Sequence, residues 1–290
     1  MRVCAWLSKN AVDLSGKRVA ITGSTGGLGR ALCRHLAALG ASLVLLDRNA
    51  SRSEAHAAAL RKEFKSAVQC ITADMEDTAS VRSAAAALTE APLDVLILNA
   101  GAYAVPRHTC ACGYDNVFTI NFLSPYLLVR LLLPHLRACG GRVVAVSSIA
   151  HDYAKADAND VDFSTRKRAS LVYGNAKRYL TYALAALFEG ESAASLAITH
   201  PGITPTGITA HYPRVIYALI KYPMRVIFMR PRKAALSLLA GVLSPTAQGK
   251  WIGPRLFGIW GFPREQVLNT ASAAERTFIA DTAERLYAAL

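Results

Sequence analysis

The chain has 290 residues, of which 52% are hydrophobic and 18% are charged, so it can bury one large core. No Ser/Gly-rich or Pro-rich run divides it, which favours a single domain over 1–290. The net charge of +13 favours an anionic partner, but no helix-turn-helix, zinc-finger or RNA-binding motif is present, so we expect no nucleic-acid partner.

Membrane and metal signals are weak. Charged residues such as Arg130 and Lys221 interrupt the apolar stretches, none of which reaches the ~20 residues that cross a bilayer. The N-terminal segment lacks the pattern of a secretion signal. Of the six cysteines only Cys110 and Cys112 are close, and no second pair completes a zinc site. We therefore expect a soluble cytoplasmic protein with reduced cysteines and no metal.

Short apolar runs alternate with helical patterns along the first two thirds of the chain. Strands are expected at 17–23, 41–47, 67–74, 93–101, 141–150 and 195–202. Helices are expected at 29–40, 51–64, 78–90, 116–138 and 170–189. This alternation predicts an α/β fold, a doubly wound parallel sheet of the Rossmann type that binds ligands at the carboxyl ends of its strands.

The first expected strand leads into the glycine-rich segment T-G-S-T-G-G-L-G at 22–29. Gly23, Gly27 and Gly29 allow a sharp turn and a close approach of the backbone to a ligand. The following helix offers free N–H groups and the positive end of its dipole. Its position between a strand and a helix predicts a site for a dinucleotide pyrophosphate.

Polar residues end the next strands. Asp47 ends the second strand, where a carboxylate can accept hydrogen bonds from the adenosine ribose and repel a 2′-phosphate. That favours NAD over NADP, although Arg48 next to it can hold a 2′-phosphate. Asp74 ends the third strand and can bind the adenine amino group, and Asn99 opens the N-A-G segment that ends the fourth.

Tyr173 and Lys177 lie one turn apart on an expected helix. Alone, such a pair has no significance. A tyrosine becomes a useful base when its pKa, ordinarily about 10, falls toward neutrality, and a nearby ammonium group can lower it. The serine pair Ser147 and Ser148 ends the fifth strand 25 residues before Tyr173 and can hydrogen-bond a substrate oxygen.

Together these motifs resemble the short-chain dehydrogenase/reductase superfamily over nearly the whole chain. The matching segments are T-G-x-x-x-G-x-G at 22–29, N-A-G at 99–101, Asn121, Ser148, Y-x-x-x-K at 173–177 and P-G-x-x-x-T at 201–206. Within that superfamily the stretches 113–136, 142–151 and 282–287 are most similar to the retinol-dehydrogenase-like group. That group usually lacks an acid at the position of Asp47 and often prefers NADP.

The resemblance implies roles for individual residues. Tyr173 would be the base, Lys177 would lower its pKa and hold the nicotinamide ribose, Ser148 would bind the substrate oxygen, and Asn121 would hold a water. His151 and His200 are then expected to be structural. The implied cofactor residues are Gly23, Thr25, Gly27, Leu28, Gly29, Asp47, Arg48, Asp74, Met75, Asn99, Ala100, Gly101, Tyr173, Lys177, Pro201, Gly202, Ile203 and Thr206.

The resemblance also suggests a substrate lid at 207–233, a helical tail at 264–290, and a homo-oligomer formed through helices 116–138 and 170–189. The lid segment is apolar with a basic face, which favours a lipophilic alcohol, ketone or aldehyde and allows a peripheral membrane contact. Two alternatives remain open. One is reduction of a 3-oxoacyl thioester, and the other is a non-catalytic protein that senses the dinucleotide.

Overall fold

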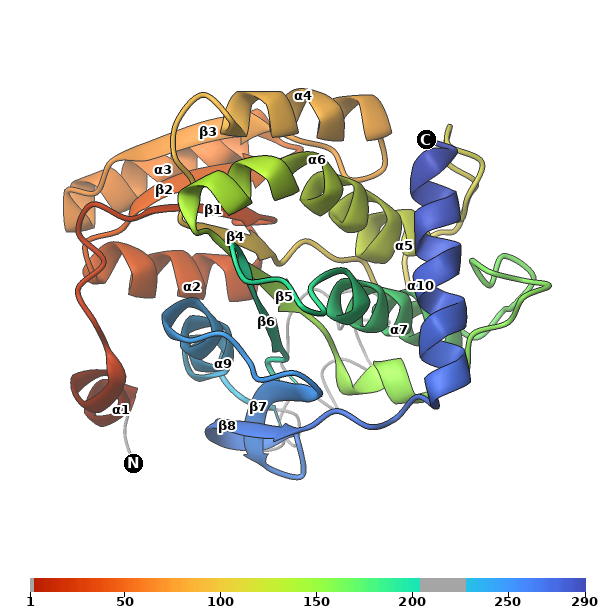
Figure 1. The fold of residues 1–290 in the computed structure, drawn as a ribbon. Coiled ribbons are helices and arrows are strands. Elements are labelled where there is room, and N and C mark those ends of the chain that lie inside the picture. The colour runs from red at the N-terminus through yellow and green to blue at the C-terminus, as the bar shows by residue number, and fades with distance from the viewer. Residues whose placement is uncertain (1–2, 204–227) are drawn as a thin grey trace, which may run out of the picture.

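The computed structural model describes residues 3–203 and 228–290, whose strands form one eight-stranded sheet (Figure 1). The strands are β1 (Arg18–Thr22), β2 (Ser42–Asp47), β3 (Val68–Thr72), β4 (Val95–Leu98), β5 (Arg142–Val146), β6 (Ser195–Thr199), β7 (Lys250–Leu256) and β8 (Trp260–Val267). Their order is β3-β2-β1-β4-β5-β6-β7-β8, and only β8 runs antiparallel to its neighbour. The order reverses between β1 and β4, where open α/β sheets bind ligands.

Helices cover both faces of the sheet. They are α1 (Val3–Asn10), α2 (Gly27–Ala38), α3 (Ala50–Phe64), α4 (Thr78–Leu88), α5 (Asn116–Phe118), α6 (Ser124–Cys139), α7 (Ala169–Leu187), α9 (Pro231–Leu243) and α10 (Ala273–Ala288). A wide π turn, η1 (Thr119–Leu123), joins α5 to α6, and a 3-10 turn, η2 (Ile149–Asp152), follows β5. Side chains of α4, α6, α7 and α10 share one core, whereas α2 and α9 pack on the opposite face (Figure 1).

The expected α/β fold with a doubly wound sheet is confirmed. Each of the six expected runs contains a strand, because runs of β-branched and aliphatic residues suit a sheet that is buried on both faces. The hairpin of β7 and β8 was not expected. Its segment contains Pro254 and Pro263, which are typical of an edge, and β7 pairs with β6 only through Thr199 and Ile252.

A buried ion pair fixes α10 across α7. The guanidinium of Arg178 is only 1% exposed and donates two hydrogen bonds to Glu275, at 2.7 and 2.6 Å. It donates two more to the backbone oxygens of His151, at 2.9 Å, and Thr270, at 2.8 Å. Since a buried guanidinium is costly unless its donors are satisfied, this network determines how the C-terminal helix docks.

Helix α10 also contacts α6. Tyr126 and Arg130 both donate to Glu284, and Ile279, Ala283 and Leu286 of α10 are buried. Part of the face of α6 and α7 that was expected to form an oligomer interface is therefore covered within the same chain, and the expected homo-oligomer remains a prediction.

Among the described residues, one continuous helical segment, Asn116–Cys139, is long and apolar enough to cross a membrane. However, 83% of its apolar window is buried inside the protein, as in the core helix of a globular fold. Its hydropathy reflects its place between the sheet, α4 and α7, and is weak evidence for a membrane span.

Two expected segments need comment. The lid at 207–233 lies outside the described residues, apart from 228–233, where α9 begins at Pro231. The expected helical tail at 264–290 begins too early, because residues 264–267 belong to β8. The helix starts at Ala273, where the Ser272 hydroxyl accepts a hydrogen bond from the backbone N–H of Glu275 and caps it.

Replacing Glu275 with alanine should leave the Arg178 guanidinium buried and unpaired. We expect Glu275→Ala to lower the free energy of unfolding by about 3 kcal/mol in a urea titration. The control is Glu63→Ala, which removes an exposed ion pair with Arg34 and should cost less than about 1 kcal/mol. Equal effects of the two substitutions would show that the buried network does not hold α10.

Candidate active site

The glycine-rich segment makes the turn between β1 and α2. Gly23 has a φ of +68°, and a Cβ there would lie 2.9 Å from Ala100 Cα, so a side chain is excluded. A Cβ on Gly29 would lie 2.4 Å from the Gly23 carbonyl oxygen. Gly26 precedes α2 and has no side chain to cap it, which leaves the first N–H groups of the helix available to an anion.

Asn99 joins the ends of β1 and β4 beneath this turn. Its Nδ2 donates to the carbonyl oxygens of Thr22, at 2.9 Å, and Gly23, at 3.0 Å. The Thr22 hydroxyl accepts hydrogen bonds from the backbone N–H groups of Asn99, at 3.0 Å, and Ala100, at 2.9 Å. Asn99 therefore shapes the turn from below.

The Asp47 carboxylate lies at the end of β2 against the glycine-rich turn. Its carboxylate is only 4% exposed and accepts hydrogen bonds from the hydroxyls of Ser24, Thr25 and Ser53 and from the Thr25 backbone N–H. Both oxygens are engaged by the chain itself. Ribose hydroxyls could bind them only by displacing bonds that hold the glycine-rich turn, so the carboxylate is first of all a structural acceptor.

The other residues expected to bind the cofactor near its adenine differ in exposure and contacts. Arg48 follows Asp47, and its side chain is 71% exposed and lies 3.8 Å from Glu76. Asp74 follows β3 and accepts a hydrogen bond from the Glu76 backbone N–H at 3.0 Å. Met75 is buried in the core, and Leu28 is partly buried in the first turn of α2.

Ser148, Tyr173 and Lys177 converge at the ends of β5 and α7. The Ser148 side chain hydrogen-bonds the phenol of Tyr173. Lys177 Nζ lies 5.7 Å from the centroid of the Tyr173 ring and donates to the carbonyl oxygen of Val146 at 2.9 Å. Ser147 instead hydrogen-bonds Thr181 at 2.6 Å, away from the tyrosine.

The pKa values of the pair differ from the expectation. Burial raises the pKa of Tyr173 to about 12 and outweighs the hydrogen bond from Ser148, which lowers it. Burial also lowers the pKa of Lys177 to about 7. Both charged forms lose hydration in the same pocket, so the lysine alone does not make the phenol acidic.

Asn121 lies in the wide turn η1 and is fully buried. Its Nδ2 donates to Ala102, at 2.8 Å, and to Val117, at 2.9 Å, whereas its Oδ1 has no hydrogen-bond partner. A Cβ on Gly101 would lie 2.8 Å from that oxygen and 3.8 Å from Lys177 Nζ. The absence of a side chain at residue 101 thus leaves room between the amide and the ammonium.

The segment after β6 is described only as far as residue 203. Gly202 has a φ of +76°, and Met229 donates its backbone N–H to the Ile203 carbonyl oxygen at 3.0 Å. Pro201 is partly buried next to Gly202. Thr206, the last expected cofactor residue, lies outside the described residues.

Apolar side chains surround Tyr173. The ring of Tyr103 meets it edge to face, with centroids 5.3 Å apart. The cluster around it contains Val105, Val117, Ala154, Phe163, Leu171 and Val172. Several of them, including Phe163 and Leu171, also line a cavity of about 430 Å³. Val117, Leu171 and Val172 come from helices α5 and α7, whereas Val105, Ala154 and Phe163 come from loops that carry no sequence motif.

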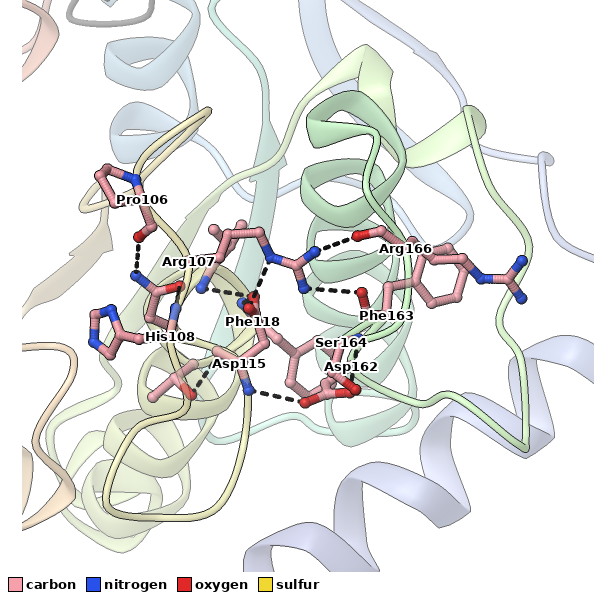
Figure 2. A network of polar contacts seen from close by, with 12 residues as sticks. Pro106, Arg107, His108, Asp115, Phe118, Asp162, Phe163, Ser164 and Arg166 are labelled. Carbon is pink, nitrogen blue, oxygen red and sulfur yellow. Dashed lines mark hydrogen bonds and ion pairs between the residues drawn. The ribbon is translucent and has the colours of Figure 1, made fainter.

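Figure 2 shows how two of these loops are joined. Arg107 donates to the Asp115 carboxylate at 2.8 Å, to the Phe163 carbonyl oxygen at 2.9 Å and to the carbonyl oxygen of Arg166. Asp162 accepts the backbone N–H of Asp115 at 2.8 Å. The loop after β4 and the loop before α7 are thereby fixed on either side of the tyrosine.

Two buried histidines flank Trp251 close to this site. His200 stacks on its ring at 4.1 Å, and His151 meets it edge to face at 4.9 Å. His151 Nδ1 lies 2.6 Å from the Ser148 carbonyl oxygen, and neither Nε2 has a hydrogen-bond partner. Burial lowers the pKa of both rings, that of His200 to about 3. Both rings pack within the chain, and the expected structural role stays a prediction.

Residues 17–165 match the family model for short chain dehydrogenases. The chain is 32% identical to human retinol dehydrogenase 14, over 84% of this chain and 79% of the relative. It is 29% identical to human polyprenol dehydrogenase, over 80% of this chain and 74% of that protein.

Solved structures with a similar fold align with most of the chain. An uncharacterized protein from Mycobacterium paratuberculosis aligns over 95% of both chains with a TM-score of 0.75 and 26% identity. A complex of RhlG with NADP from Pseudomonas aeruginosa aligns over 79% of this chain and 90% of that chain, with a TM-score of 0.61 and 26% identity.

The buried histidines predict acid sensitivity of the fold. The pKa of His200 is lower in the folded protein than its value of about 6.5 in an unfolded chain, so only the unfolded chain takes up a proton as the pH falls below 6.5. The contribution of this histidine to the free energy of unfolding is therefore fully present above pH 6.5. As the pH falls further, the free energy of unfolding decreases by about 1.4 kcal/mol per pH unit until the pH reaches the pKa of the folded protein.

Urea titrations between pH 7 and pH 4.5 should show this slope in the native protein, and a slope smaller by about one proton in His200→Asn. The slope, not the absolute stability, is the readout, since the substitution also removes the stacking on Trp251. An unchanged slope would assign the proton uptake to other groups.

Proposed function

This chain belongs to the short-chain dehydrogenase family, and from that premise we propose that Ser148, Tyr173, Lys177 and Asn121 form its catalytic site. It is an NAD(P)-dependent oxidoreductase that acts on CH–OH groups. The observation that supports the site best is the space beside Gly101, which is bounded by the unpartnered Oδ1 of Asn121 and by Lys177 Nζ. The glycine turn and the uncapped start of α2 fit a dinucleotide.

A nicotinamide dinucleotide supplies the acceptor or donor of the hydride when it is bound. In the proposed oxidation, the Tyr173 phenolate takes the hydroxyl proton of the alcohol, while the Ser148 hydroxyl donates a hydrogen bond to the same oxygen. Lys177 in its ammonium form stabilises the phenolate, and the Asn121 Oδ1 accepts a hydrogen bond from a water that can pass protons to Lys177.

The raised pKa of Tyr173 sets a condition for this chemistry. A phenol with a pKa of about 12 is almost fully protonated at neutral pH, which suits a general acid that protonates the oxygen of a carbonyl substrate. Oxidation of an alcohol requires additional positive charge near the ring. The same side chain serves both directions, as the acid in reduction and as the base in oxidation.

The substrate that we propose is a lipophilic alcohol or its carbonyl form. The aromatic and aliphatic cluster around Tyr173 supports an apolar substrate. The names of the related retinol and polyprenol dehydrogenases point to the same class. Reduction of a 3-oxoacyl thioester is the alternative enzyme reaction, and turnover of a retinoid and a long-chain polyprenol against an acyl thioester distinguishes them.

The peripheral membrane contact stays a prediction, and an exposed apolar segment between β7 and β8 supports it. Phe257, in the turn between β7 and β8, is 94% exposed, and Leu256 at the end of β7, next to Arg255, is 54% exposed. Apolar side chains beside a cation are typical of contact with a lipid surface. The cytoplasmic location expected from the sequence is likewise a prediction.

For the dinucleotide, we propose that Arg48 rather than Asp47 decides between the two forms. NAD was favoured because a free Asp47 would accept the ribose hydroxyls, but its oxygens are already engaged. The exposed Arg48 can reach a 2′-phosphate, which supports use of NADP as well.

Arg48→Ala should therefore raise the KM for NADP by about tenfold, the loss expected for one charged hydrogen bond, and leave the KM for NAD nearly unchanged. Arg52→Ala, which removes another exposed arginine in the first turn of α3, is the control. Steady-state kinetics with both dinucleotides measures the effect. If the two KM values move together, Arg48 does not face the 2′ position.

The acid–base role of Tyr173 has a direct test. Tyr173→Phe should lower kcat by about a thousandfold, because it removes the proton donor, while dinucleotide binding followed by fluorescence stays close to that of the native protein. Tyr103→Phe removes the hydroxyl of the neighbouring ring and should keep most of the activity. Normal turnover by Tyr173→Phe would refute the assignment. A native protein that binds the dinucleotide without any turnover would favour the sensing alternative.

A further inference from the structure

A second group of potential ligands lies apart from the proposed catalytic residues. This group consists of Glu76, His108 and Cys110, whose ligand atoms all lie within 4.8 Å of one another. No other three His, Cys, Asp or Glu side chains in the described part of the chain lie so close together. His108 Nε2 lies 3.0 Å from Glu76 Oε2. We propose that these three side chains bind a zinc ion between the loop after β3 and the loop after β4.

The backbone brings His108 and Cys110 to the same side. Residues 108–116 form a small hairpin, in which Thr109 bridges Asp115 and Cys110 donates its backbone N–H to the Tyr114 carbonyl oxygen at 2.8 Å. Gly113, with a φ of +87°, closes the turn. In an extended segment, side chains two residues apart point to the same face, which explains why a spacing of H-x-C presents two ligands together.

The base of this hairpin is held before any ion binds. Asn116 donates its side-chain N–H to the Pro106 carbonyl oxygen at 3.0 Å and its backbone N–H to the His108 carbonyl oxygen at 3.0 Å. Figure 2 shows the Arg107 guanidinium bound to the Asp115 carboxylate next to His108. The backbone of the hairpin therefore needs little further ordering when an ion binds.

The two carboxylate oxygens of Glu76 have different partners, so one can bind the ion and the other Arg48. Its Oε2 faces His108, whereas its Oε1 lies 3.8 Å from the Arg48 guanidinium. An ion bound at Oε2 can leave Arg48 on the other oxygen. The backbone N–H of Glu76 also donates to Asp74, which holds the loop after β3 at this residue.

The ligand types select the metal. Imidazole nitrogen, thiolate sulfur and carboxylate oxygen together suit zinc, whereas magnesium and calcium prefer oxygen alone. Tetrahedral zinc bonds place neighbouring ligand atoms about 3.3 to 3.8 Å apart. His108 Nε2 and Glu76 Oε2, now 3.0 Å apart, would therefore separate slightly, while the other ligand atoms, all within 4.8 Å, need only a small shift. Cys110 is buried and His108 is exposed, so an ion can enter from the solvent, with a water completing the fourth position.

Binding would release the proton of the Cys110 thiol and break the hydrogen bond between His108 and Glu76, so that the neutral imidazole carries its proton on Nδ1 and ligates through Nε2. No oxidation state changes. It would join the loop at the adenine end of the dinucleotide site to the loop that carries Tyr103. This inference does not depend on the proposed catalytic function.

The test uses the untagged full chain, reduced and freed of metal with a chelator, and titrated with Co²⁺ as a spectroscopic probe. We expect one equivalent of Co²⁺ to give the visible bands of a tetrahedral site and a thiolate-to-cobalt charge-transfer band, and Zn²⁺ to displace it. Cys110→Ser should abolish the charge-transfer band and weaken binding at least tenfold. Cys112→Ser is the matched control, since its sulfur lies outside the group and 3.6 Å from the Thr119 hydroxyl.

Zn²⁺ should also raise the melting temperature of the native protein and of Cys112→Ser, but not that of Cys110→Ser. If Cys110→Ser does not fold, His108→Asn and Glu76→Gln provide the same comparison, and each should weaken Co²⁺ binding at least tenfold. The proposal is wrong if the native protein gives no thiolate band, or if Cys110→Ser and Cys112→Ser bind Co²⁺ equally. Either result would leave only the hydrogen bond between His108 and Glu76.

Discussion

Helix α7 carries two consecutive cationic side chains into the protein interior, and the proposed site depends on how each of them is satisfied. Lys177 points to the end of β5, where it donates to the Val146 carbonyl oxygen. Arg178 points the other way and is held by Glu275 and by two backbone oxygens. Because both cations are buried, rotation of α7 about its axis would leave at least one of them without a partner. Tyr173, one turn earlier, is positioned by the same constraint.

The nucleotide end is likewise held by polar side chains that the chain itself satisfies. Thr22 and Asn99 exchange hydrogen bonds across the point where the strand order reverses, and Asp47 collects the hydroxyls of the glycine turn. The turn is therefore shaped by the acceptors that its own side chains and backbone contact. Both ends of the proposed site thus take their geometry from polar residues that the chain itself satisfies.

The sequence allowed the fold to be predicted where the signal is local. The strands β1 to β6 are short apolar runs, and the glycine turn follows β1 directly, so periodicity and a motif were sufficient. The hairpin of β7 and β8 carries two prolines and an irregular pattern, which concealed it. Ser148, Tyr173 and Lys177 were brought together by the structure as expected, although their assignment to catalysis remains a proposal.

Long-range relations could not be read from the sequence. The pairing of Arg178 with Glu275 spans 97 residues, and Glu76 meets His108 across 32. The part played by Asp47 depends on hydroxyls that converge only in the folded chain, and the raised pKa of Tyr173 depends on burial by helices and loops from several parts of the chain. In each case the sequence identified the residue type, but the three-dimensional surroundings decided its chemistry.

The direction of the Asn121 side chain depends on the number of residues in the wide turn Thr119–Leu123. A π turn holds about one residue more than the α-helical turn that it replaces, and each helical residue advances the rotation by about 100°. Loss of Thr119 or Ile120 would carry the amide away from Gly101 while every side chain of the proposed site kept its identity. A change in chain length here could therefore separate two otherwise similar proteins in activity, although their motifs would align without a mismatch.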